Sequence, residues 1–138
     1  MLAKSYVVLF LVILFVLCNG SFDAKHQENQ TMNNIQSNLK TNISLKSAMP
    51  LNAKWVNFDC GEVGRFVLPS EKAHYITWIP IDQDLSCHVN WGHSEATVTV
   101  FDAKIDHGHL VVNWLIRPDG FYHSLDNFFW DKRASWEH

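Results

Sequence analysis

Eight short runs of Val, Ile, Thr and aromatic residues, separated by turn residues, constrain the fold of this chain more than any other feature. Within them apolar and polar residues alternate with the period of a strand rather than that of a helix. Their spacing of about eight to twelve residues predicts an all-β fold, a small antiparallel β-sandwich or else a barrel. The expected strands are Asn42–Lys46, Lys54–Cys60, Arg65–Leu68, Tyr75–Ile79, Leu85–Trp91, Thr97–Phe101, Leu110–Arg117 and Phe121–Ser124.

The last part of the chain, Leu125–Trp136, fits either a helical turn or one more strand. Just before it, Val111 and Leu115 fall on the outer face of their run, opposite its buried positions. They are expected to meet the aromatic residues 128–130, or to form an exposed patch that binds a partner.

The N-terminal residues have the pattern of a secretory signal. Lys4 precedes an unbroken apolar run, Val7–Leu17, which is too short to span a bilayer as a helix, and small residues follow it. We therefore expect residues 1–20 to be a signal peptide cut near Gly20–Ser21, with an uncleaved signal anchor as the alternative. The mature protein is then expected to be secreted, without stable membrane insertion.

Cleavage would remove Cys18 and leave two cysteines, Cys60 and Cys87. An even pair in a secreted chain predicts a disulfide, and both residues fall on the apolar faces of their runs, as a bridge in the core requires. Such a bridge contributes roughly 3–4 kcal/mol in the chain-entropy model. The alternative is a pair of buried free thiols.

Residues 21–40 are rich in Asn and Gln and poor in large apolar residues, so they cannot bury enough surface to offset the entropy of ordering. We expect a disordered arm there and one folded domain over residues 41–138. Two glycosylation sequons occur, at Asn29 in the arm and at Asn42 where the domain begins. Asn42 is the less certain acceptor, because it lies in an expected strand.

The charge of the chain argues against some partners. The whole chain carries −3 with histidine neutral, and removal of residues 1–20 leaves ten basic against fourteen acidic residues, or −4. No basic patch stands out, which disfavours nucleic acid and anionic membranes as partners.

Eight histidines are many for this length, but their spacing matches no known metal site. The tightest group is His107 and His109 beside Asp106, and we interpret these histidines as solvent-facing loop residues. No metal and no cofactor are expected. A small secreted hydrolase could use a histidine pair such as His74 and His88, but no local motif organises them.

Asp119 could be a working carboxylate or the corner of a hairpin. The stretch Arg117–Gly120 reads Arg-Pro-Asp-Gly, in which proline suits the first corner of a turn, Asp the second, and glycine the left-handed position that closes it. A structural role for Asp119 is therefore expected.

The order of these motifs resembles the plant self-incompatibility protein S1 family, the S-protein homologues. The matching stretches lie between about Thr41 and Trp136, most of the mature chain, and the ordered set is more specific than any one piece. They are a strand ending in Cys60, then GRFVLP, HYITWIP, LSCHVNW, VTVFDAK and VNWLIRPDGFY.

The resemblance implies a small secreted β-sandwich with a core disulfide between Cys60 and Cys87 and no catalytic activity. It implies an extracellular signalling ligand that binds a cell-surface receptor protein through variable hydrophilic loops. The best candidate here is the loop 102–109, and the loop 92–95 is second. The expected contact residues are Asp102, Lys104, Asp106, His107 and His109, and we expect a monomer.

Three departures from the family pattern argue against a role in self-incompatibility itself. A second cysteine pair common in the family is absent, with Val112 and Tyr122 in that region. The segment between Cys60 and Gly64 is shortened, and the N-terminal arm is longer than the family needs. These departures fit a divergent homologue, and they leave a secreted effector or defence protein on the same fold as the alternative function.

Overall fold

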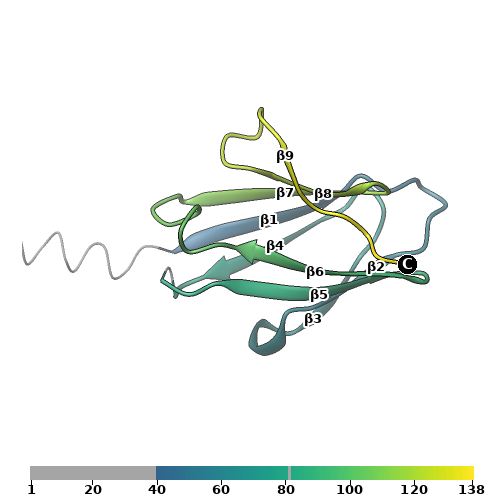
Figure 1. The fold of residues 1–138 in the computed structure, drawn as a ribbon, viewed down its shortest axis with the longest axis horizontal. Coiled ribbons are helices and arrows are strands. Elements are labelled where there is room, and N and C mark those ends of the chain that lie inside the picture. Colours follow the sequence, from purple (N-terminus) through teal and green to yellow (C-terminus); the bar gives the residue numbers. More distant parts are fainter. Residues whose placement is uncertain (1–39, 81) are drawn as a thin grey trace, which may run out of the picture. The chain divides into compact units, whose positions relative to one another are not determined.

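The computed structural model describes residues 40–80 and 82–138, which form two stacked β-sheets (Figure 1). The predicted signal peptide, the sequon at Asn29 and all of the predicted arm except Lys40 lie outside these residues. One sheet has the strand order β4 (Ala73–Trp78), β1 (Thr41–Ser47), β7 (Val111–Arg117), β8 (Gly120–Ser124), β9 (Asp131–Ala134). The other has the order β3 (Arg65–Leu68), β2 (Val56–Asp59), β5 (Leu85–Trp91), β6 (Ser94–Phe101).

The predicted all-β sandwich is confirmed, with one difference in how its strands pair. All neighbouring strands are antiparallel except β1 and β7, which run parallel, with Ile43 opposite Val112 and Leu45 opposite Trp114. Alternation within a strand shows which face is buried but carries no information about the direction of its neighbour. The mixed five-stranded sheet therefore could not be predicted from the pattern alone.

The structure corrects the bounds of several expected strands and shows that the strand alternative holds for the C-terminal segment. β6 begins at Ser94 rather than Thr97, because Gly92, with a φ of +61°, closes a tight hairpin after β5. The second candidate loop, residues 92–95, is therefore shortened to Gly92 and His93. Lys54 and Trp55 precede β2 instead of belonging to it, and the ambiguous C-terminal segment contains the short edge strand β9.

The core lies between the two sheets and contains the predicted disulfide. Cys60 and Cys87 are bonded across 27 residues of sequence, and both are almost fully buried. The alternative of two free thiols is excluded. The inward positions predicted from alternation are buried too, among them Val56, Phe58, Val89, Val98, Val100, Val112, Trp114 and Ile116.

Aromatic and backbone contacts join the sheets at their edges. On the side of β3 and β4, the Phe66 ring stacks on the His74 ring with a centroid distance of 3.7 Å. On the side of β6 and β9, the backbones of Glu95 and Glu137 form a bridge with N···O distances of 3.0 and 2.8 Å.

The hairpin between β7 and β8 answers the question raised by Asp119. Arg117 pairs with Gly120, so Pro118 and Asp119 form the corner. The Asp119 carboxylate accepts a hydrogen bond from the Tyr122 hydroxyl, which lowers the pKa of Asp119 and raises the pKa of Tyr122. The predicted turn is confirmed, and the side chains of Asp119 and Tyr122 form a contact that stabilises it.

Candidate functional site

Two loops meet at one end of the sandwich, and we call this the loop end. β7 begins directly after the β6–β7 loop, residues 102–110, and β8 ends at the β8–β9 loop, residues 125–130. Because β7 and β8 are antiparallel, with Asn113 opposite Ser124, the two loops come to the same end of the sheet.

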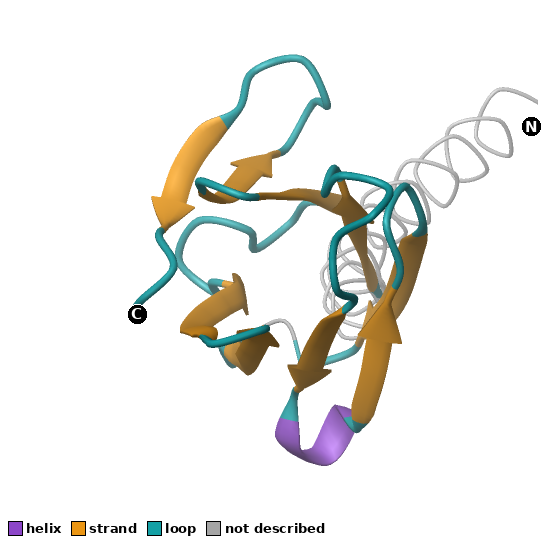
Figure 2. Cartoon of the chain, turned by 90° about the vertical axis from the view of Figure 1, so that its right-hand side faces the viewer, coloured by secondary structure: helices purple, strands orange, loops and turns teal. Residues whose placement is uncertain are grey.

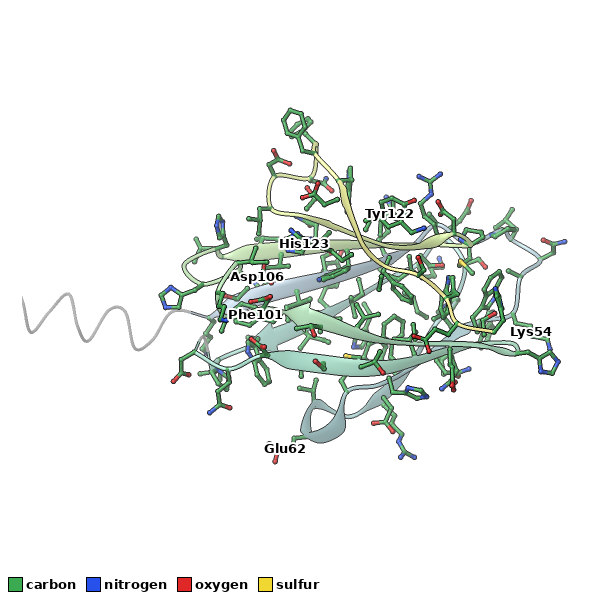
Figure 3. The ribbon with its side chains drawn as sticks, in the orientation of Figure 1. Lys54, Glu62, Phe101, Asp106, Tyr122 and His123 are labelled. Atoms are coloured by element: carbon green, nitrogen blue, oxygen red, sulfur yellow. A yellow bond between two sulfur atoms is a disulfide. The ribbon has the colours of Figure 1, made fainter. Side chains whose placement is uncertain are left out.

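The β6–β7 loop is fixed to the sheet by Asp106, whose carboxylate is almost fully buried. One oxygen, Oδ2, accepts the backbone N–H of Asp102 at 2.8 Å, and the other, Oδ1, lies 2.7 Å from Nε2 of His123 on β8. Figure 3 shows Asp106 and His123 facing each other from the loop and the strand. Buried polar groups must be paired, so this contact helps to fix where the loop sits.

This burial removes Asp106 from the predicted contact surface. Its two oxygens are used inside the domain, so it positions the loop rather than meeting a partner. Lys104, His107 and His109 are exposed, as a contact surface requires, and Asp102 is half-buried. The predicted site thus separates into a buried support and an exposed rim.

His123 was not among the predicted site residues. The sequence does contain a signal for it, because it lies two residues after the inward-facing Phe121 and must share its face. An inward histidine needs a polar partner, and the nearby predicted loop contains two carboxylates. Only the fold selects Asp106 over Asp102.

The β8–β9 loop is held by the Asp126 side chain. Its Oδ1 accepts the backbone N–H groups of Phe128 and Phe129, both at 2.9 Å, and the Ser124 hydroxyl at 3.1 Å. The N–H groups of Phe129 and Phe128 lower the pKa of Asp126. Asn127 takes the left-handed conformation, φ +63°, which its short polar side chain tolerates.

These bonds present two phenyl rings to solvent. Phe128 is 85% and Phe129 82% exposed, and Figures 1 and 2 both show their loop standing out from the sheets. Val111 is 44% exposed, as the exposed-patch alternative predicts, whereas Leu115 and Trp130 are half-buried. We call Phe128 and Phe129 the aromatic tip.

Two pockets lie at the loop end, and one of them reaches the tip. One, of about 230 Å³, opens between β6 and β9 and is lined by Trp114, His123 and Arg133. The second is lined by Ile105 of one loop and Phe129 of the other, so the two loops share a surface. The loop end therefore combines an apolar projection with a depression of mixed polar and apolar lining next to it.

The residues suggested for a hydrolase take part in separate contacts. His74 stacks on Phe66 at the β3–β4 edge, and burial lowers its pKa. His88 lies on the outer face of β5, with Nε2 3.7 Å from Glu95 Oε2. Nothing in these contacts organises the two histidines around a common reacting group.

Residues 40–80 and 82–138 contain no group of three or more His, Cys, Asp or Glu side chains placed to hold a metal ion. Within the same ranges, no helix is long and apolar enough to cross a membrane. The sequon residue Asn42 lies exposed in β1, where its Oδ1 accepts a hydrogen bond from the Thr77 hydroxyl at 3.3 Å.

Among solved structures, the fold is similar to that of a self-incompatibility protein homologue, described as one of "a widespread family of small, highly stable, secreted proteins from plants". The TM-score is 0.58 at 14% identity, over 72% of this chain and 96% of the other. No family model matches the sequence. No curated protein matches it either. The fold implied by the sequence resemblance is thus confirmed.

Proposed function

We propose that this chain is a divergent, secreted self-incompatibility protein homologue that acts as an extracellular ligand and binds a cell-surface protein through its loop end. The shared fold and the ordered sequence motifs support the family assignment. The N-terminal apolar run and the core disulfide support secretion, because disulfides persist in oxidising compartments.

The observation that carries the proposal is the rigid exposure of the aromatic tip. Two adjacent phenyl rings in water are unfavourable by about 25 cal/mol for each Å² of apolar surface, so their exposure calls for a binding partner. Large aromatic side chains dominate the energetic centre of protein interfaces. The bonds to Asp126 preorganise the tip, which reduces the entropy lost on binding.

The exposed part of the β6–β7 loop supplies a polar rim next to this centre. Lys104, His107 and His109 are solvent-accessible, and the Asp106–His123 contact keeps their loop in place. Polar rims of this kind contribute to specificity and association rate more than to affinity. We therefore assign affinity to the tip and selectivity to the loop.

The test is binding of the labelled full chain, expressed through a secretory pathway with its disulfide formed, to intact plant cells that include pollen. We expect saturable, competable binding to at least one cell type. The double variant Phe128→Ser/Phe129→Ser should lose it, and the triple variant Lys104→Ala/His107→Ala/His109→Ala should weaken it. The matched control is Leu51→Ser, since Leu51 is 77% exposed in the β1–β2 connection at the opposite end.

Unsaturable binding to every cell type, or binding that the tip variant leaves intact, would contradict the proposal. Saturable binding to a soluble extracellular protein instead of cells would favour an effector or defence protein that uses the same fold on another target.

A further inference from the structure

The outer face of the four-stranded sheet is almost entirely polar, and its side chains lie in register. β2 and β5 pair Asn57 with Asn90 and Asp59 with His88. The neighbouring strands add further polar side chains in the same rows. The outward residues are Arg65, Val67, Asn57, Asp59, Ser86, His88, Asn90, Glu95, Thr97 and Thr99.

Two open grooves run along this face and join. Both are lined by Asn57 and Val67. The first continues to Trp55 and Gly92 at one end of the sheet, and the second to the side chains around Asp59 and Arg65. The side chain of Lys54 lies over Gly92, and Figure 3 shows Lys54 at that end of the sheet. The two grooves together form an open surface from Trp55 to Arg65, which suits an extended ligand.

Polar groups of opposite character lie close together on this face. Arg65 Nε lies 2.7 Å from Asp59 Oδ2, and His88 Nε2 lies 3.7 Å from Glu95 Oε2. No run of one sign remains to attract a polyanion or a polycation. Charge complementarity therefore favours a neutral ligand that hydrogen-bonds.

Trp55 gives the groove a flat apolar end. Its side chain is 61% exposed and lies in the irregular segment before β2, where the sheet does not require a tryptophan. An indole offers a broad planar surface, while each Asn amide both donates and accepts hydrogen bonds. A sugar ring has the matching chemistry, with C–H groups on one face and hydroxyls around its edge.

We propose that this face binds a neutral oligosaccharide, with one sugar ring stacked on Trp55 and the hydroxyls of neighbouring sugars bonded to Asn57 and Asn90. The site lies on a different surface from the loop end and does not depend on the proposed receptor binding. It would let the protein adhere to an extracellular polysaccharide while its loop end stays free.

Calorimetric and NMR titration of the disulfide-bonded full chain with cellohexaose, xylohexaose and mannohexaose tests the proposal. We expect at least one of these neutral hexasaccharides to bind, with backbone amide shifts on β2 and β5 and at Trp55. Trp55→Ala should weaken binding by about tenfold or more, and Trp55→Tyr should retain part of it. The control is Tyr75→Ala, because Tyr75 is 69% exposed but lies on the five-stranded sheet.

Absence of binding by all three hexasaccharides at millimolar concentration would overturn the proposal. Binding that survives Trp55→Ala in a protein with unchanged circular dichroism would overturn it too, as would a clear preference for the polyanion hexagalacturonate that disappears with added salt.

Discussion

His123 Nε2 lies 2.7 Å from Asp106 Oδ1 in the interior of the domain, where the two side chains are 6% and 1% exposed. This contact connects β8 to a loop that is also held by the backbone N–H of Ala103 bonded to Asp84 and by the Thr41 hydroxyl bonded to the His109 carbonyl. It is the buried contact that joins the proposed rim to β8, the strand that leads into the aromatic tip.

Removal of either partner should therefore destabilise the domain strongly. Asp106→Ala or His123→Ala leaves a buried polar group unpaired, and we expect each to lower the free energy of unfolding by about 3 kcal/mol. The double variant should cost much less than the sum, because it removes both groups of one pair. Urea denaturation of the four proteins measures this coupling, and additive costs would show that the contact is not formed.

The disulfide should behave as one unit in the same way. Cys60→Ser and Cys87→Ser are each expected to cost about 3–4 kcal/mol, because either change opens the 27-residue loop. The double variant should be no less stable than the worse single variant. Guanidinium denaturation under non-reducing conditions gives the three values, and simple addition of the two single costs would contradict a bond between these residues.

His74 should make stability depend on pH. Burial lowers its pKa in the folded protein below the ordinary value of 6.5, so below about pH 6.5 the unfolded chain binds more protons than the folded one. Stability should then fall as the pH drops from 7 toward 5. His74→Phe keeps a ring against Phe66 but cannot titrate, so its stability should fall less over that range.

The control for His74 is His88→Gln, which replaces an exposed histidine. Thermal unfolding measured at half-unit pH steps separates the two residues. A His74→Phe variant with the same pH slope as the parent would assign the dependence to other groups.

The sequence predicted those features that repeat locally. The bounds of β3 and β5 match the expected runs, and the alternation around Cys60 and Cys87 placed both in the core. Local pattern sufficed there because a half-buried strand repeats its burial every two residues.

The features that were missed depend on contacts between distant segments. The parallel pairing of β1 with β7 and the Asp106–His123 contact join residues far apart in sequence. The pairing leaves no local pattern, and alternation indicates that His123 points inward but does not identify Asp106 as its partner. The exposure of Phe128 and Phe129 is also opposite to what their hydrophobicity favours. Exceptions of this kind are expected where a surface serves binding.

Gly120 should tolerate no side chain. A Cβ there would lie 2.4 Å from the Ala134 carbonyl oxygen on β9, and the backbone φ is +144°. We expect Gly120→Ala to cost about 3 kcal/mol through this clash and the backbone strain. Gly108→Ala is the matched control, because Gly108 also has a positive φ, +83°, but no atom lies within 4 Å of its added Cβ. Equal costs in urea denaturation would show that strain alone, without the clash, explains the requirement for glycine at 120.

Asp126 should control the aromatic tip without controlling the fold. Asp126→Ala removes the acceptor for the N–H groups of Phe128 and Phe129, so their amide hydrogens should exchange faster with solvent. Asp126→Asn keeps an acceptor oxygen and should show a smaller effect. The midpoint of thermal unfolding should change little in either variant, because the carboxylate is solvent-exposed. Asp131→Ala, which removes a neighbouring exposed carboxylate, is the control.

The same bonds predict how the tip responds to acid. Because the N–H groups of Phe129 and Phe128 lower the pKa of Asp126, the order of the loop should persist above the ordinary pKa of 3.8 and be lost as the pH falls below it.

Asp126→Ala retains both phenyl rings, so weaker cell binding by this variant would show that preorganisation matters as well as hydrophobicity. If binding instead stays at the parental level while amide exchange accelerates, the rings suffice in any conformation, and the rigid loop needs another explanation.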